Sequence, residues 1–488
     1  MTVPMIERTA LELRSAILSG ETTAHAACSA VLTRLEAIGR ATGAVSEVFP
    51  TSALATAEKI DARLRSGESA RPLEGIPFTA KVNIATLEGV THAGSRFLAE
   101  HRAVEEATAV RRLRDAGAIL IGKTHCDEFA MGSSNENSAF GVVRNPWQLD
   151  HVPGGSSGGA ASVAAALGGS VHLGSDTGGS IRQPAAYCGV TGMKPTFGTV
   201  SRSGLVAFGS SLDQIGPLAR DAKDASAFLA VMAGPDPRDG TTRTEINDDF
   251  LEAAVPRRIG IPRDYFPDAI EPETRAAVEA AIEVLRADGA TLVEVDLPMT
   301  AHANACYQVV STAEASTNLS RYDGVHVGAR CDDPADLEDL LARSRAAGFG
   351  AEVRRRILLG TFVLSAGYQE AFYRRALRVR RKIANDFARV FGEVEALIAP
   401  VSPIPAFKIG ERVTDPLALY ACDILTVGAN LAAIPAASVP GGLTSAGLPI
   451  GVQFLGPWGG DGGVLALARH YQTLSSHHQP LAPLEVSR

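Results

Sequence analysis

The first 65 residues carry apolar side chains at helical spacing. Leucine, isoleucine and valine recur every three or four positions, first at Leu11, Leu13, Ile17 and Leu18 and then at Val31, Leu32, Leu35 and Ile38. This spacing gives each segment one apolar stripe, as in an amphipathic helix. Ser19-Gly20 separates the two segments, and Thr22-Thr23 can cap the second. We therefore expect residues 1–70 to form an N-terminal helical segment that packs on a larger core.

From Leu73 onward the pattern changes to short apolar runs that alternate with helical segments. The runs are typical of buried strands and occupy residues 76–82, 118–121, 171–173, 258–261, 292–295, 396–398 and 451–454. Helices are predicted among them, at residues 107–116 and 156–167. This alternation predicts an α/β fold, with a mixed, largely parallel sheet covered by helices on both faces. We expect residues 71–488 to form one α/β domain, and we expect this domain and the N-terminal segment to form one compact unit.

Residues 298–393 interrupt this alternation. They are helical in pattern and rich in charge, for example in Glu352-Val353-Arg354-Arg355-Arg356 and in residues 374–382. Runs of arginine on a helix usually form a solvated face. We interpret this region as a helical insertion that covers the sheet edge or the functional site.

Composition excludes several classes of function. The 488 residues include 45% hydrophobic and 20% charged residues, which is ordinary for a globular protein with a large core. The net charge of −8 argues against the chain being the main nucleic-acid-binding surface, since phosphate binding needs clustered Lys and Arg. The six cysteines are scattered without a C-x-x-C pair, which predicts reduced thiols and no metal site. Residues 1–8 contain no apolar run, so no signal peptide is predicted and we expect a cytoplasmic protein.

Residues 117–124 match the phosphate-loop pattern G-x-x-x-x-G-K-[ST]. In that motif the intervening residues form a loop whose N–H groups face the phosphates. Here they are Ala-Ile-Leu-Ile, which predict a buried strand that ends at Gly122. We therefore reject a nucleotide site at this position, an alternative that would require the chain alone to bind ATP.

Residues 155–159 match G-x-S-x-G, with Ser157 at the centre. That nucleophile elbow needs a strand before the serine and a later acid and histidine. Asp150 and Pro153 give the preceding segment the character of a turn, and the downstream histidines have no supporting pattern. Ser157 is therefore not the expected nucleophile.

The densest glycine content lies between Gly154 and Pro184, in Gly-Gly-Ser-Ser-Gly-Gly and Asp-Thr-Gly-Gly-Ser-Ile-Arg-Gln-Pro. Glycine is costly to order, so such loops usually exist where backbone N–H groups must approach something closely. Consecutive N–H groups of one loop can form an oxyanion hole, and we assign this role to Thr177, Gly178, Gly179 and Ser180. A helix is predicted to begin after Ser180, so its positive end would face that serine.

Lys81 is the candidate base for a serine nucleophile, because it lies in an apolar run after Phe78-Thr79-Ala80. Burial there would disfavour the charged form and lower the lysine pKa toward a useful range. Taken alone, the position fits a paired or snorkelling lysine equally well.

The spacing of Lys81, Ser156 and Ser180, together with the two glycine loops, resembles the amidase signature family. The resemblance implies the fold of that family and a Ser–cis-Ser–Lys triad. In such a triad Ser180 attacks an amide carbonyl, and Ser156, on a cis peptide bond, relays its proton to neutral Lys81. Structural support is expected from Ser157, Asp176 and Arg182.

Further blocks resemble the A subunits (glutaminases) of Glu-tRNA(Gln)/Asp-tRNA(Asn) amidotransferases. They cover residues 127–141, 198–216, 236–239, 322–325, 355–361 and 422–427, and so extend over essentially the whole chain. The resemblance implies hydrolysis of glutamine and transfer of ammonia within a heterotrimer that also contains a B subunit plus a small C subunit. The B subunit would use ATP and Mg²⁺ on the misacylated tRNA, and this chain would need no cofactor of its own.

Free glutamine presents a carboxylate that suits a guanidinium and an ammonium that suits a carboxylate. The resemblance places Arg356 on the carboxylate, Asp423 on the ammonium and Tyr307 beside them. It also places Met131, Gly132 and Ser133 at the substrate. Two alternatives remain open, a free-standing amidase for a small amide and a catalytically silent scaffold.

Overall fold

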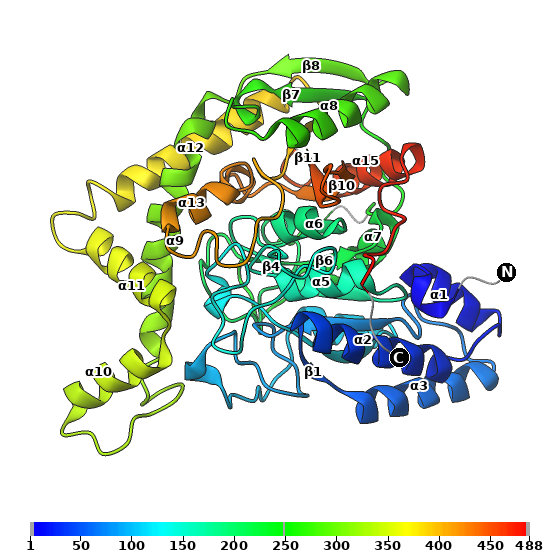
Figure 1. Ribbon diagram of the computed structural model, residues 1–488, viewed down its shortest axis with the longest axis horizontal. Coiled ribbons are helices and arrows are strands. Elements are labelled where there is room, and N and C mark those ends of the chain that lie inside the picture. The colour runs from blue at the N-terminus through cyan, green and yellow to red at the C-terminus, as the bar shows by residue number, and fades with distance from the viewer. Residues whose placement is uncertain (1–3, 247–248, 485–488) are drawn as a thin grey trace.

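The structure, a computed structural model, describes residues 4–246 and 249–484. Within these residues eleven strands form one continuous sheet (Figure 1). In spatial order the strands are β1 (Val45–Val48), β3 (Ile119–Thr124), β2 (Pro77–Lys81), β4 (Val171–Asp176), β6 (Gln214–Ala219), β5 (Thr191–Lys194), β10 (Ala436–Leu443), β11 (Pro449–Leu455), β9 (Ala396–Pro400), β7 (Arg258–Pro262) and β8 (Thr291–Val295). The mixed α/β class predicted from the sequence is confirmed.

The prediction of a largely parallel sheet needs correction. Parallel pairing is confined to β3-β2-β4 and to β9-β7-β8, and six of the ten neighbouring strand pairs in the described chain are antiparallel. Apart from β1-β3, the antiparallel pairs lie at the centre of the sheet. Strands there that are not joined by a crossover helix reverse direction. The hairpin β10-β11 is the clearest case, because five residues connect its strands and a parallel connection needs a dozen or more.

Helices cover both faces of the sheet because successive strand residues point to opposite sides. In β3, Leu120 packs in a core with helices α4 (Thr108–Asp115), α7 (Ala222–Met232), α8 (Pro272–Ala287) and α15 (Asp461–Leu474). Ile119 and Ile121 face the other side, against α2 (Ala24–Thr42), α3 (Pro50–Arg65) and α5 (Gly158–Ala166).

The N-terminal region is helical as predicted, with α1 (Ala10–Leu18) preceding α2 and α3. Thr23 caps α2 by accepting a hydrogen bond from Ala26 N at 3.0 Å. The sequence did not indicate β1, which lies between α2 and α3 and pairs antiparallel with β3. A half-buried edge strand of four residues leaves too short an alternation to recognise.

A helical arm, defined here as α9 (Ala303–Asn318), α10 (Leu337–Gly348), α11 (Ala351–Leu364) and α12 (Tyr373–Val390), stands beside the sheet on the left of Figure 1. Its helices account for most of residues 298–393, as predicted. The remaining α-helices of the described residues are the short α6 (Arg182–Cys188), α13 (Pro416–Tyr420) and α14 (Val427–Leu431). No helix in the described ranges is long and apolar enough to cross a membrane.

Gly360 is the point where α11 packs directly on α9. A Cβ at Gly360 would overlap the carbonyl oxygen of Thr312 and lie 2.7 Å from Ser316 Cβ. The close approach of the two backbones fixes α11, and with it any side chain that α11 directs toward the sheet.

We expect Gly360→Ala to destabilise the protein, although alanine favours a helix by about 1 kcal/mol. Overpacking against a backbone atom costs about 1–3 kcal/mol, so the clash prevails. The midpoint of urea unfolding should fall. Gly240→Ala is the control, because a Cβ at Gly240 meets no atom within 4 Å. A higher midpoint for Gly360→Ala would show that α9 and α11 separate without cost.

Candidate active site

The centre of the site is a buried lysine surrounded by hydroxyl groups. Lys81 ends β2, and its Nζ donates to Ser156 Oγ at 2.7 Å, to Ser157 Oγ at 3.0 Å and to Ser175 Oγ at 3.0 Å. Asn83 Nδ2 also donates to Ser175 Oγ, at 2.9 Å. The strand period positions the lysine, because Phe78 and Ala80 enter the apolar core and Lys81 points to the opposite side of β2.

Burial lowers the pKa of Lys81 to about 8, against the opposing charges of Asp127 and Asp176. Its direct neighbours are neutral hydroxyls, and no carboxylate within the described residues forms an ion pair with it. No adjacent negative charge compensates the buried ammonium, so its protonated form is disfavoured. Lys81 can therefore lose its proton near neutral pH and act as a base.

Ser156 follows a cis peptide bond after Gly155. Gly155 N donates to Gln183 Oε1 at 2.9 Å, which ties this turn to α6. A Cβ at Gly155 would overlap the carboxylate of Asp127, so only glycine fits. The turn thereby brings Ser156 Oγ within hydrogen-bond reach of Lys81.

Ser180 is the least buried member of the predicted triad. It is 8% exposed, whereas Lys81 and Ser156 are fully buried. Within the described chain its Oγ makes no hydrogen bond, and its carbonyl accepts from Ser157 N at 3.1 Å. A hydroxyl that is accessible and free of a fixed partner is the arrangement that a nucleophile requires.

The loop before Ser180 has no room for side chains at its two glycines. A Cβ at Gly178 would meet the Tyr307 ring at 2.5 Å, and one at Gly179, where φ is +142°, would overlap Thr426. Gly179 N already donates to Asp176 Oδ1 at 2.9 Å. Of the four predicted oxyanion donors, the described structure therefore leaves the amides of Thr177, Gly178 and Ser180 without a protein acceptor.

Asp176 and Arg182 form a buried ion pair beneath this loop. Arg182 Nε donates to Asp176 Oδ2 and Nη2 to Oδ1, each at 3.1 Å, and both side chains are fully buried. Burial opposes ionisation of Asp176, but the charge of Arg182 prevails and lowers its pKa to about 2. Ser157 donates to the Ser175 carbonyl at 3.0 Å. All three predicted support residues thus hold the glycine loops.

Two charged groups lie at one end of the serine loop. Ser133 Oγ donates to Asp423 Oδ2, while Asp423 Oδ1 is shielded from solvent and has no hydrogen-bond partner in the described chain. Burial raises the pKa of Asp423 to about 7. Thr426, one turn later, donates to the Gly178 carbonyl at 2.6 Å, so Asp423 is tied to the oxyanion loop.

Arg356 is 4% exposed and projects from α11. Its Nε donates to Glu352 Oε1 at 2.8 Å, and Tyr420 OH donates to the same oxygen at 2.6 Å. The guanidinium lies over the rings of Phe208 and Tyr420, at 5.4 and 5.2 Å from their centroids. Burial opposes its charge, but Glu352 prevails and raises the pKa of Arg356 further, so the guanidinium stays charged.

The structure brings most of the predicted site residues together. Tyr307 packs over Gly178, and burial raises its pKa, while the nearby charges of Arg356 and Asp423 act on it in opposite directions. Met131 is buried in an apolar cluster with Phe208, the ring over which Arg356 lies, and Gly132 packs on Asp127. Of the segment Met131-Gly132-Ser133, Ser133 alone contacts a charged member of the site.

Sequence reasoning missed Asn83, Ser175, Gln183, Thr426 and Glu352, which contact the triad or its neighbours. Asn83 and Ser175 had a usable signal, since each lies close in sequence to a predicted site residue. Glu352 also had a usable signal in the sequence, because it precedes Arg356 by one helical turn. Thr426 is brought to Gly178 by tertiary contact alone.

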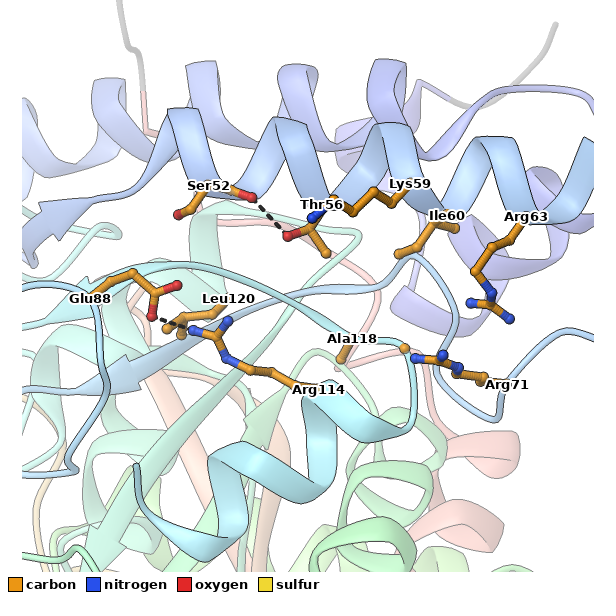
Figure 2. Close-up of a pocket in the computed structure, with 11 residues that line it drawn as sticks. Ser52, Thr56, Lys59, Ile60, Arg63, Arg71, Glu88, Arg114, Ala118 and Leu120 are labelled. Atoms are coloured by element: carbon orange, nitrogen blue, oxygen red, sulfur yellow. Dashed lines mark hydrogen bonds and ion pairs between the residues drawn. The ribbon is translucent and has the colours of Figure 1, made fainter. Parts of the chain in front are cut away.

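The phosphate-loop pattern does not form a nucleotide site. Residues 119–124 are β3, paired with β2, and the strand continues two residues beyond the predicted end. Lys123 is buried, and its Nζ donates to Val90 O at 3.0 Å and to Thr91 Oγ1 at 2.7 Å. Gly117 borders a hollow of about 230 Å³ between α3 and β3, in which Arg114 is bound to Glu88 (Figure 2). This hollow shares no residue with the serine–lysine centre.

In the described ranges, no group of three or more His, Cys, Asp or Glu side chains could hold a metal ion. The six cysteines, all described, are free thiols.

Comparison with known proteins gives a consistent picture. The family model Amidase matches residues 26–465. The A subunit of glutamyl-tRNA(Gln) amidotransferase from Halorhodospira halophila is 48% identical over 479 residues, which cover 97% of this chain and 99% of the relative. Its counterpart from Myxococcus xanthus is 48% identical over 485 residues, which cover 98% and 100%. The crystal structure of the counterpart from Thermotoga maritima is 37% identical and matches with a TM-score of 0.80 over 100% of both chains.

We expect the rate at which a serine-reactive acyl probe labels Ser180 to rise with pH and to reach half its maximum near pH 8. Below its pKa of about 8 Lys81 is protonated and cannot accept the proton, and above it the amine is free. Lys81→Ala should slow labelling about 10²- to 10⁴-fold and remove this pH dependence. Ser180→Ala should abolish labelling.

Lys123→Met is the matched control, because burial also lowers the pKa of Lys123, to about 7, on the neighbouring strand. The control should keep the wild-type pH profile of labelling. The assignment of Lys81 as base would be contradicted if the pH dependence of labelling persisted in Lys81→Ala. A shift of this pH dependence in Lys123→Met would contradict it as well.

Proposed function

The chain belongs to the amidase family, and from this premise we propose that it is the glutamine-hydrolysing A subunit of a tRNA-dependent amidotransferase. One observation carries the proposal: a guanidinium and a carboxylate of opposite charge flank the loop that presents Ser180. Arg356 is held from α11, and Asp423 is tied through Thr426 to that loop.

These two groups suit the two charged ends of free glutamine. The Nη atoms of Arg356 donate to no protein acceptor in the described structure, because its hydrogen bond to Glu352 uses Nε. They can therefore bind a carboxylate, as guanidinium groups do in paired geometry. Asp423 Oδ1 lacks a partner and can accept from an ammonium group. A carboxylate left buried and unpaired is costly, and an ammonium ligand compensates it.

The hydroxyl network supplies the reaction itself. Neutral Lys81 has two N–H donors and one lone pair, so it can donate to Ser157 and Ser175 while accepting from Ser156. Ser180 Oγ attacks the side-chain carbonyl of glutamine, and its proton passes through Ser156 to Lys81. The oxyanion is stabilised by free amides of this loop, those of Thr177, Gly178 and Ser180. The proton returns to the departing ammonia, and water then hydrolyses the acyl-enzyme to glutamate and regenerates Ser180.

The ammonia would be used by partner subunits in the cytoplasm. The relatives are subunits of glutamyl-tRNA(Gln) amidotransferase, which supports a heterotrimer that also contains a B subunit plus a small C subunit. In this arrangement the B subunit holds the misacylated tRNA and activates it with ATP and Mg²⁺. The net charge of −8 of the present chain agrees with tRNA binding by a partner.

The alternative of a free-standing amidase for a small neutral amide is less well supported. Such a substrate has neither a carboxylate for Arg356 nor an ammonium for Asp423. Arg356 is almost completely buried, and two aromatic rings and a glutamate position it. With a neutral amide as substrate, this arginine would have no ligand to bind. The full-length similarity to amidotransferase subunits points the same way.

Arg356→Ala should raise the KM for glutamine about 10- to 100-fold, since a charge-assisted hydrogen bond to the substrate carboxylate is worth about 1.5–3 kcal/mol. Steady-state glutaminase assays measure this change. Arg354→Ala is the control, because Arg354 lies exposed on the same helix, and its KM should match the wild type. An unchanged KM for Arg356→Ala would overturn the glutaminase assignment.

Glu352→Gln should raise the same KM about 3- to 10-fold with little change in kcat, because Glu352 positions Arg356 through a charge-assisted hydrogen bond that the amide weakens. The double variant Glu352→Gln/Arg356→Ala should bind glutamine no worse than Arg356→Ala, since the two residues act as one unit. A lower kcat with unchanged KM would assign Glu352 a different role.

A further inference from the structure

An exposed apolar face lies at the outer edge of the helical arm. It comprises residues from α11, from the α11–α12 turn and from the start of α12, and we refer to it as the α11–α12 face: Leu358, Leu359, Phe362, Tyr368, Phe372 and Leu377. Leu358 is 71% exposed and Phe362 is 47% exposed. Single exposed apolar residues are common, but six on two connected helices and their turn, three of them in mutual ring contact, mark an interaction site.

The aromatic members of this face pack on one another rather than into the core. The Phe362 ring lies 4.5 Å from the Tyr368 ring and 5.9 Å from the Phe372 ring, and the Tyr368 and Phe372 rings are 6.1 Å apart. Figure 1 shows the α11–α12 turn at the left-hand edge of the molecule, away from the sheet. The cluster is therefore ordered by its own contacts and presented outward.

A hollow of about 230 Å³ adjoins the face where α11 ends and α12 begins. Leu364 lines it from α11 and Tyr373 from α12, and Ala313 and Glu314 line it from α9. Protein interfaces concentrate their binding energy where a side chain of one partner fills such a hollow in the other. The hollow gives the face a place for an anchoring residue.

The border of the face is strongly basic. It contains seven exposed cations: Arg354, Arg355, Arg374, Arg375, Arg378, Arg381 and Lys382. Glu370 pairs with Arg374 at 2.8 Å, and Glu352 accepts from Arg355, which leaves most of these charges uncompensated. In a chain with a net charge of −8, this local excess favours an occupant with carboxylates at matching positions.

The face and the glutamine site share one helix. On α11 the residues Val353, Arg356 and Gly360 are buried, whereas Leu358, Leu359 and Phe362 point outward. A helix is about 10–12 Å across, so an occupant of the face would sit close to the carboxylate ligand Arg356. The partner that receives the ammonia must dock near this site.

We propose that the α11–α12 face docks the ammonia-accepting protein partner, through a partner surface with an apolar centre and a carboxylate border. The proposal rests on the proposed function. A second copy of this chain fits poorly, because a symmetric contact would bring two basic borders together. RNA would use the arginines but not the exposed leucines and phenylalanines, since nucleic-acid interfaces are more polar.

The test uses the full chain with the B and C subunits of its own complex. Leu358→Asp/Phe362→Asp should weaken its affinity for the B–C pair about 30-fold or more, as expected for residues at the centre of an interface. Arg375→Glu/Arg378→Glu should weaken it about 3- to 10-fold, mainly at low salt. Val104→Asp is the control, because Val104 is 93% exposed in a loop and belongs to no part of the face.

Two further measurements separate docking from misfolding. The rate of acyl-probe labelling of Ser180 in each isolated variant should equal that of the wild type, since none of these residues belongs to the site. Maleimide labelling of a Leu359→Cys variant should be about 10-fold slower in the assembled complex than in the free chain.

Wild-type affinity of the Leu358→Asp/Phe362→Asp variant, or equal maleimide rates in the free and assembled states, would overturn the docking proposal alone. Loss of tRNA or anionic-vesicle binding by that variant, with normal assembly, would also overturn it and assign the face to RNA or a membrane. A wild-type chain that does not assemble with the B–C pair would overturn the proposed function as well.

Discussion

The site depends on the buried ion pair between Asp176 and Arg182. Asp176 accepts from Gly179 N, Ile181 N and Asn430 Nδ2, in addition to Arg182, and so fixes the loop that presents Ser180. Arg182 Nη1 extends the network to Thr426 O at 3.0 Å and to Gln453 Oε1 at 2.7 Å. Removal of one partner from a buried pair typically costs about 3–5 kcal/mol, because the other charge is left uncompensated. The loop that presents Ser180 and the Asp423 segment are thus held by one electrostatic contact.

This constraint separates two environments within the same site. The ion pair keeps Asp176 ionised at a pKa of about 2, whereas the nearby Lys81 is surrounded by hydroxyls and has a pKa lowered to about 8. Both groups are fully buried, so the difference comes from their partners rather than from solvent. A permanently charged scaffold and a base that can lose its proton near neutral pH therefore coexist in neighbouring strands.

Much of this arrangement could be predicted from the sequence. The strand that carries Lys81, the helix after Ser156 and the two glycine loops all have clear local patterns, and the structure contains each of them. The sequence did not indicate β5, β6 or β10, because glycine and proline interrupt them. These residues are tolerated where side-chain packing and neighbouring strands stabilise the sheet, and local propensity cannot report that.

The sequence alone determined the chemical groups of the site, since Lys81, Ser156 and Ser180 stand in distinctive apolar and glycine-rich surroundings. Tertiary structure decided which of those groups meet and in what state. It buries Lys81 among three hydroxyls and uses the amide of Gly179 to bind Asp176. These outcomes depend on burial and on contacts between residues far apart in the chain, which the order of residues does not display.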